Sequence, residues 1–360
     1  MGIKHLNRYL LSQCSENAIS KKPLAELHNK VVVVDTSIYL YKFVETGALI
    51  EGFYNMISIF RKYHIVPVFV FDGKPPVEKK ELLEKRRMEK LDAEQKYRVL
   101  QQQLETGEPE PKEKTEIAHE LEMLKKRFVR IKHTDIEITK SLFTSYGVHY
   151  IESAGESDQL CAYLVKKAYA WACVSDDMDM FVYGCPRVIR HISLLNHTGV
   201  VYDTATILYE LNMSYPTFRD LLVLSGTDYN LNNTSTANLK ESLLWYDEYI
   251  GSDSEIPLYD WLTEHTTYIH DKSHLEKTRD LFDLSTFSIL HQRELRDIIT
   301  RMPFRNREIQ HDQLRALLET DGFIFMSKFS GETTEGRLVG KSKFSEETTD
   351  KRSDRRLVGK

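Results

Sequence analysis

Residues 30–35 read KVVVVD and residues 65–72 read IVPVFVFD, and these two stretches decide the fold class. Both are too continuously apolar for half-exposed strands, and both are typical of strands buried on two faces of a parallel sheet. Two further apolar stretches and three helix-like stretches continue the pattern along the chain: 148–151 and 170–174, then 38–63, 134–145 and 159–168. This alternation predicts an α/β fold with a mostly parallel sheet flanked by helices.

The composition is that of an ordinary globular protein. Of 360 residues, 41% are hydrophobic and 29% are charged, which excludes a wholly disordered chain. No apolar stretch approaches the ~18 residues that a membrane span needs. Cys14, Cys161, Cys173 and Cys185 show no CxxC spacing and suit reduced thiols of an intracellular protein. The net charge of −5 does not exclude nucleic acid, because binding depends on a local basic face.

The chain is expected to divide into five segments. The sheet region covers 1–77 and 134–230, and the charged insertion at 78–133 predicts two long polar helices joined by a turn. Residues 231–326 are predicted to be helical. Residues 327–360 carry two copies of a short repeat without an apolar face, which predicts a disordered tail, more in keeping with a dispensable segment than with an interaction arm.

Acidic residues follow the apolar strands or begin helices at several places. They are Asp35, Asp72, Glu156, Asp158, Asp177, Asp179 and Asp228. The i, i+2 spacing of 156/158 and 177/179 would put each pair on one side of an extended backbone. Carboxylates gathered at one sheet edge repel unless cations neutralise them, and such hard oxygen ligands suit two Mg²⁺ ions. The alternative is a set of unrelated turn and helix-cap residues.

Six motifs in order give the chain a resemblance to a known family. They are MGIKHLNRYL at 1–10, VVVVDTSIYLYKF at 31–43, VFVFDGKPPVEKKELLEKRR at 68–87, ESAGESDQLCAYLV at 152–165, CVSDDMDMFVYG at 173–184 and LLVLSGTDY at 221–229. The chain resembles the flap endonucleases and their relatives, the XPG-type 5′ nucleases. The resemblance implies a PIN/FEN-like fold and a metal-dependent nuclease that cuts branched DNA near a 5′ flap or end. It also implies that the seven carboxylates hold two Mg²⁺ ions, for which Mn²⁺ can substitute. Asp158 stands where many relatives have Glu, which favours ligation through water.

The same resemblance gives roles to several other residues. Residues 78–132 resemble the helical arch through which the 5′ strand passes. Lys79 and Arg86 would reach the scissile phosphate, and Lys90 lies on the same predicted helix face. For the remaining charges of the arch, a solvated surface is the simpler interpretation. Gly2 would let the start of the chain approach DNA. Tyr41 matches an aromatic residue that stacks on a base, although a core aromatic is an equal alternative.

The resemblance fails after Asp228. The family has a Gly-x-Gly hairpin there that binds duplex phosphates and a K⁺ ion through backbone groups, whereas residues 229–240 contain no glycine. The sequence therefore does not support the K⁺ site, and the tail lacks the family's sliding-clamp peptide. These departures indicate a divergent member, of a kind that a large DNA virus could encode. The resemblance places the protein in the nucleus, or in the cytoplasm if its source is viral.

Three functions remain open at this point. The first is a monomeric 5′ flap endonuclease and 5′–3′ exonuclease that acts on branched or 5′-ended DNA in replication, repair or recombination, with no membrane partner. The second is a less selective 5′–3′ exonuclease that also accepts RNA. The third is a nuclease-fold scaffold without catalysis, which the retention of all seven carboxylates disfavours.

Overall fold

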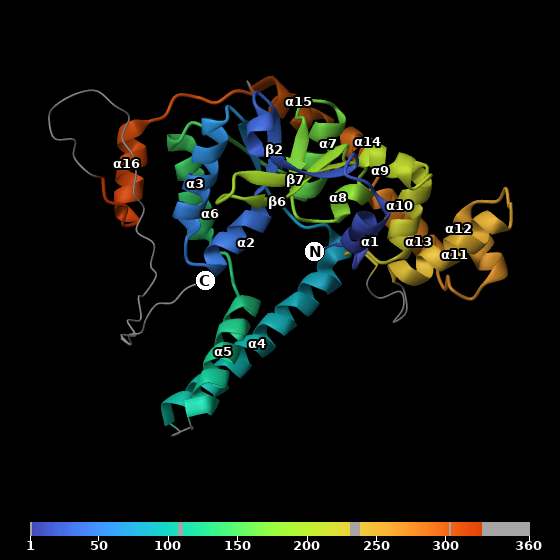
Figure 1. The fold of residues 1–360 in the computed structure, drawn as a ribbon, viewed down its shortest axis with the longest axis horizontal. Helices are drawn as coiled ribbons and strands as arrows, with labels where there is room; N and C mark the ends of the chain where they lie inside the picture. The colour runs from blue at the N-terminus through green and yellow to red at the C-terminus, as the bar shows by residue number, and fades with distance from the viewer. Residues whose placement is uncertain (1, 107–110, 231–237, 302–303, 326–360) are drawn as a thin grey trace, which may run out of the picture.

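The computed structural model describes residues 2–106, 111–230, 238–301 and 304–325. Its centre is a seven-stranded sheet with the order β1-β7-β6-β5-β2-β3-β4 (Figure 1). The strands are β1 (Ile19–Pro23), β2 (Val31–Asp35), β3 (Val66–Phe71), β4 (His149–Glu152), β5 (Ala172–Val174), β6 (Arg187–Ser193) and β7 (Thr198–Asp203). Strands β6, β5, β2, β3 and β4 pair in parallel, while β7 is antiparallel to β6 and β1. The predicted α/β class with a mostly parallel sheet is therefore confirmed.

Helices cover both faces of the sheet and extend beyond it. In the first two thirds of the chain they are α1 (Leu6–Gln13), α2 (Thr36–Glu45), α3 (Leu49–Lys62), α4 (Lys80–Thr106), α5 (Pro111–Arg127), α6 (His133–Ser145), α7 (Ser157–Lys166), α8 (Asp179–Val182), α9 (Thr204–Glu210) and α10 (Tyr215–Leu224). The remaining ones are α11 (Leu239–Gly251), α12 (Leu258–His265), α13 (Lys272–Leu281), α14 (Leu284–Leu290), α15 (Gln292–Arg301) and α16 (His311–Thr320). Two short 3₁₀ turns are η1 (Leu24–Leu27) and η2 (Val77–Lys79).

The alternation of side chains along the buried strands creates two hydrophobic cores. In β2, Val33 points into one core, and Val32 and Val34 point into the other. The first core includes side chains of α1, α7, α8 and α10, and the second includes those of α2, α3, α6 and α16. The central strands β2 and β3 are buried along almost their whole length, and Asp35 and Asp72 stand where these two strands end.

Three strands and one helix break differ from the sequence expectation. Strands β1, β6 and β7 were not expected, since their residues mix charged and apolar side chains, as in RVIRHIS at 187–193. The stretch 38–63 was expected to be continuously helical, but it forms α2 and α3 on either side of Gly47, which has φ 67°. A positive φ costs glycine little, so the chain can turn sharply at this point.

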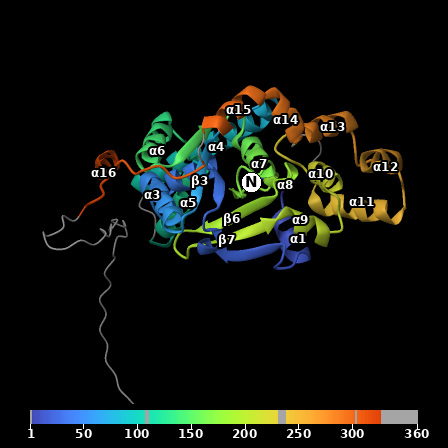
Figure 2. The same ribbon diagram turned by 90° about the horizontal axis from the view of Figure 1, so that it is seen from above.

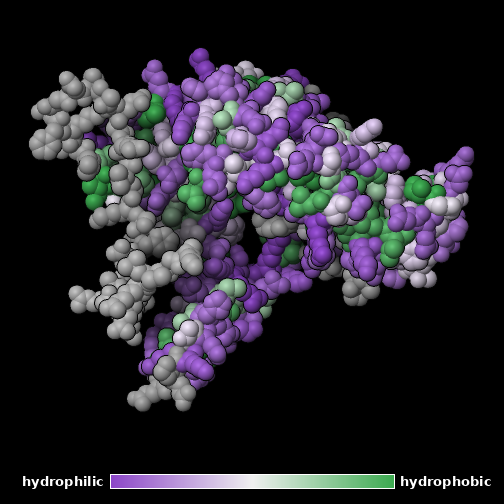
Figure 3. Space-filling model, viewed as in Figure 1, coloured by the Kyte–Doolittle hydropathy of each residue, from purple (hydrophilic) through white to green (hydrophobic). Residues whose placement is uncertain are grey.

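Helices α4 and α5 form the predicted polar hairpin, which projects away from the sheet (Figure 1). A narrow apolar seam holds them together: Ala93 and Leu124 are buried, and the rings of Tyr97 and Phe128 meet edge-on at 5.3 Å. The rest of the hairpin surface in view is predominantly hydrophilic (Figure 3). We call residues 77–132 the arch and its first turns, residues 77–90, the arch base. The turn at 107–110 lies outside the described residues.

The C-terminal helices separate into two groups. Helices α11 and α12 lie at the opposite end of the molecule from α16 (Figure 2). Residues 305–310 return to the sheet region, where the Gln310 N–H donates to the Ser145 carbonyl, and α16 then packs on the second core. Among the described residues, no helix is both long and apolar enough to cross a membrane. The expectations for the degenerate hairpin at 231–237 and for the tail at 327–360 fall outside the described residues.

Candidate active site

Asp35 and Asp72 are fixed at the carboxyl ends of adjacent strands. Asp35 ends β2 and accepts hydrogen bonds from the hydroxyls of Ser157 (3.1 Å) and Ser175 (3.0 Å). Asp72 directly follows β3 and accepts from the Ser37 hydroxyl (2.5 Å) and from the Ser157 N–H (2.8 Å). Ser157 thus contacts both carboxylates, so the start of α7 holds these two strand ends together.

Asp177 and Asp179 follow β5 at the same edge of the sheet. The Asp179 N–H donates to Asp177 Oδ1 at 3.0 Å, while Asp179 Oδ1 is buried and has no hydrogen-bond partner among the described residues. Gly2 lies against this pair with φ 74°. A Cβ atom on Gly2 would come within 2.5 Å of Asp177 Oδ1 and 2.7 Å of Asp179 Oδ1. Only glycine therefore fits here, and the structure places Gly2 beside the carboxylates.

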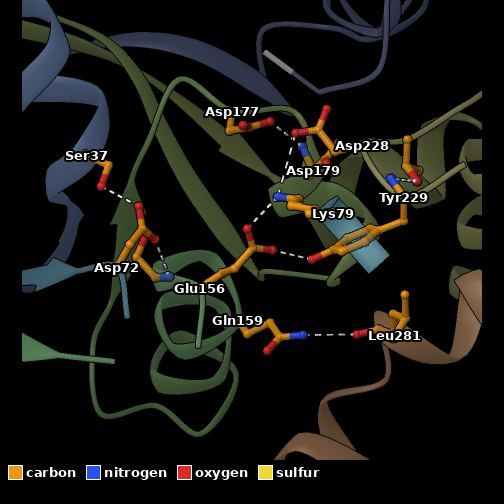
Figure 4. Close-up of polar contacts among 12 residues, drawn as sticks. Ser37, Asp72, Lys79, Glu156, Gln159, Asp177, Asp179, Asp228, Tyr229 and Leu281 are labelled. Carbon is orange, nitrogen blue, oxygen red and sulfur yellow. Dashed lines mark hydrogen bonds and ion pairs between the residues drawn. The ribbon is translucent and has the colours of Figure 1, made fainter. Parts of the chain in front are cut away.

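Glu156 and Asp228 face the arch base (Figure 4). Lys79 Nζ donates to Glu156 Oε1 at 2.6 Å and lies 3.7 Å from Asp228 Oδ2. Arg86 forms a second ion pair with Asp228 Oδ2 at 3.0 Å. The Tyr229 hydroxyl donates to the other oxygen of Glu156. Two carboxylates of the predicted set are thus paired with cations of the arch.

The spacing argument for the two acidic pairs was wrong, although both pairs reach the site. Glu156 precedes α7 and Asp158 lies in its first turn, while Asp177 lies in a loop and Asp179 begins α8. None of the four is in extended strand backbone. The pairs converge because α7 and α8 each begin after a short loop that follows a parallel strand, β4 and β5 respectively. Asp176 lies in the same motif as Asp177 but matches no carboxylate of the family's metal set; it accepts the His191 N–H at 2.7 Å and so anchors β6.

Crowding of carboxylates raises several pKa values. Burial, followed by the charges of Asp72 and Asp177, raises the pKa of Asp35 to about 7, against the opposing hydrogen bonds of Ser175 and Ser157. Burial and then Asp35 and Asp177 raise the pKa of Asp158, and burial and then Asp177 and Asp228 raise that of Asp179. For Lys79, burial lowers the pKa, but the charge and hydrogen bond of Glu156 together with the charges of Asp158 and Asp228 outweigh burial, and the net shift is upward. Such a site favours bound cations.

The oxygen-only donor set suits Mg²⁺ or Mn²⁺, and the buried Oδ1 of Asp179 has no hydrogen-bond partner among the described residues. Within the described ranges, however, no three His, Cys, Asp or Glu side chains are grouped closely enough to hold a metal ion. The contacts give a physical reason. Glu156 and Asp228 are turned toward Lys79 and Arg86, while Asp35 and Asp72 are held by serine hydroxyls. The chemistry of these side chains fits a metal centre. Two of the predicted ligands, Glu156 and Asp228, form ion pairs with Lys79 and Arg86 of the arch base.

Lys79, Arg86 and Lys90 were predicted to share one helix face, but they do not all point toward the carboxylates. Lys79 lies in η2, just before α4, and only 7% of it is exposed. Lys79 and Arg86 both reach Asp228, as a shared direction would require. Lys90 instead donates to the Val129 carbonyl at 3.1 Å and lies 4.9 Å from the Tyr41 ring centre. Tyr41 is 42% exposed, which contradicts the core-aromatic alternative.

Four residues of the site were missed in the sequence. Ser37, Ser157 and Ser175 support Asp35 and Asp72, and Tyr229 supports Glu156. A signal existed for the serines, because each lies within two residues of a predicted carboxylate or strand end. Tyr229 adjoins Asp228, but its contact with Glu156 spans 73 residues of chain and depends on how α10 and α7 pack.

The pKa of Asp35 predicts how stability depends on pH in the absence of divalent metal. The pKa of Asp in an unfolded chain is about 3.9. Between about pH 4 and 7, Asp35 is therefore protonated in the folded state but ionised in the unfolded state. The contribution of Asp35 to stability is therefore greatest below this window and falls as the pH rises through it. Asp35→Asn should raise the unfolding midpoint at pH 8 by roughly 2–5 °C in EDTA and change little at pH 4–5. Asp176→Asn is the control, and an equal gain from it would contradict the assignment.

Family comparisons agree with this geometry. Residues 1–93 match the XPG N-terminal domain, and residues 147–228 match the XPG I-region. The chain is 30% identical over 248 residues to flap endonuclease 1-A of Sorghum bicolor, covering 64% of this chain and 62% of that protein. It is 28% identical over 246 residues to flap endonuclease 1 of Methanococcus aeolicus, covering 63% and 72%. The matching part thus spans a little under two thirds of the plant relative.

Solved structures share the fold at low sequence identity. The catalytic core of Rad2 in complex with DNA substrate matches with a TM-score of 0.56 and 21% identity, over 89% of this chain and 94% of that one. Human GEN1 in complex with Holliday junction DNA matches with a TM-score of 0.54 and 17% identity, over 89% and 73%. These likenesses confirm the predicted PIN/FEN-like fold. The two matched regions and the flap endonuclease relatives show that residues 1–93 and 147–228 are similar to the corresponding regions of the XPG-type nucleases.

Proposed function

We propose that the protein is a structure-specific 5′ nuclease that hydrolyses phosphodiesters of branched or 5′-ended DNA, as a flap endonuclease and 5′–3′ exonuclease in replication, repair or recombination. One observation carries the proposal: the base of a projecting helical arch places Lys79 and Arg86 on Glu156, just before α7, and on Asp228, in the loop after α10. Cationic side chains and carboxylates that could bind metal ions thus lie together, and hydrolysis of a phosphodiester uses both kinds of group. The relatives named flap endonuclease 1 support the same activity.

The metal-binding role belongs to the carboxylates of the site. They are Asp35, Asp72, Glu156, Asp158, Asp177, Asp179 and Asp228. Two bound Mg²⁺ ions would activate a water molecule and stabilise the leaving oxygen. Ser37, Ser157 and Ser175 orient Asp35 and Asp72 by donating hydrogen bonds to them. These hydrogen bonds fix the direction of the two carboxylate side chains.

The arch base would act on the scissile phosphate. Lys79 and Arg86 are the cations nearest to the carboxylates, and their charges can stabilise negative charge that develops on phosphate oxygens. The exposed ring of Tyr41, with Lys90 beside it, offers a stacking surface for a DNA base. Gly2 removes a side chain from the approach to Asp177 and Asp179.

The test compares three labelled substrates with and without Mg²⁺. A 5′-flapped duplex should be cut fastest, a blunt duplex more slowly, and nothing should be cut in EDTA. Cleavage of single-stranded RNA at the rate of the flap would favour the less selective exonuclease. Intact substrates in Mg²⁺ and in Mn²⁺, together with no divalent binding in a calorimetric titration, would favour the scaffold alternative and contradict the proposal.

A further inference from the structure

Both carboxylate oxygens of Glu156 are occupied by donors from the protein itself. Lys79 Nζ donates to Oε1 at 2.6 Å, and the Tyr229 hydroxyl donates to Oε2. Figure 4 shows the two donors approaching this side chain from different elements, Lys79 from the arch base and Tyr229 from the loop after α10. Glu156 therefore has both of its ligand atoms committed before any cation binds.

The ammonium group of Lys79 is held by more than this one contact. It lies 3.7 Å from Asp228 Oδ2 and 4.9 Å from the centre of the Tyr229 ring, so the face of the ring adds a cation–π attraction. Tyr229 is itself buried, and its hydroxyl lies 3.2 Å from that of Tyr183. The Lys79 ammonium group thus lies between the carboxylates of Glu156 and Asp228 and the ring of Tyr229, whose hydroxyl contacts that of Tyr183.

We propose that Lys79 is an internal counter-ion that competes with divalent metal for Glu156 and Asp228, and that Tyr229 is the positioning residue that keeps it there. The proposal rests on the proposed function and deepens it. A cation near these two ligands stabilises their negative charge in the same way as a metal would, so the two cannot use the same oxygens together.

This arrangement couples metal binding to DNA binding. A phosphate that draws Lys79 away from Glu156 and Asp228 also releases these carboxylates toward the other ligands. Because coupling of two binding events is reciprocal, DNA should raise metal affinity by the factor by which metal raises DNA affinity. The full metal site would then form only when a strand lies at the arch base.

The test is calorimetric titration of Mn²⁺ into the DNA-free protein. Lys79→Met keeps the length of the side chain but removes the competing charge, and it should tighten Mn²⁺ binding by about tenfold or more. Lys85→Met is the matched control: it removes the same charge from the same end of the arch, but its side chain is not paired with any carboxylate in the described part of the chain, and affinity should change less than about twofold. Equal tightening in both variants would show a general field effect and overturn the proposal.

A second variant keeps the test decisive if Lys79→Met does not fold. Tyr229→Phe retains the buried ring and frees one oxygen of Glu156, so it should tighten Mn²⁺ binding by about threefold. Unchanged or weaker Mn²⁺ binding in the folded variants would overturn the proposal. That outcome differs from failure of the proposed function, in which the wild-type protein itself would bind no Mn²⁺ and cut no DNA.

Discussion

Asp179→Asn is expected to slow flap cleavage in Mg²⁺ by at least about a thousandfold while DNA affinity stays within about threefold. Asparagine has nearly the same size, so packing at the start of α8 is kept, but the negative charge is lost. Among the described carboxylates of the site, Asp179 Oδ1 is the one oxygen that is buried without a hydrogen-bond partner. Replacing it therefore breaks no hydrogen bond of that oxygen. Gel-based single-turnover rates and fluorescence anisotropy measure the two quantities.

Asp176→Asn is the control for this experiment. Asp176 is only three residues away, but its oxygen accepts the His191 N–H, a role that an asparagine oxygen can also fill. Its cleavage rate should stay near that of the wild type. Cleavage by Asp179→Asn at a near wild-type rate would show that this residue is not a metal ligand.

Lys79→Ala and Arg86→Ala should each lower the single-turnover rate at saturating Mg²⁺ by about a hundredfold, with DNA affinity reduced by less than about threefold. The reason is positional. Both cations lie on carboxylates of the site, so they would face charge that appears on the phosphate during the reaction. Saturating Mg²⁺ is needed because Lys79 also affects how tightly the metal binds.

The comparison for these two variants comes from the second helix of the arch. Lys125 and Lys126 lie in the last turn of α5, carry the same charge and have no ion pair with a described carboxylate. Lys125→Ala should weaken DNA binding slightly and leave the rate of the bound complex unchanged. A rate loss as large as that of Lys79→Ala would mean that the arch acts only through its general positive charge.

The sequence alone determined the sheet region and the place of the carboxylates. Stretches such as 31–34 and 66–71 are apolar at every position, and such strands are stable only when both faces are covered, which requires parallel strands with helices between them. Asp35 and Asp72 come directly after these strands, and parallel strands end at one edge, so their meeting followed from the pattern. The mixed strands β1, β6 and β7 carried no such signal, because their pairing partners decide which residues are buried.

Only the tertiary structure decided how the site is completed. Lys79 and Glu156 are 77 residues apart, and Tyr229 is 73 residues from Glu156, so their contacts depend on the direction in which the arch leaves the sheet and on the packing of α10. Gly2 reaches Asp177 and Asp179 for the same kind of reason. Local periodicity reports which face of an element is buried, whereas the partner of a polar group at the end of an element is set by long-range packing. The sequence therefore predicted which carboxylates lie near the sheet edge, and the fold determined that Glu156 is held by Lys79 and Tyr229 and that Asp228 is paired with Lys79 and Arg86.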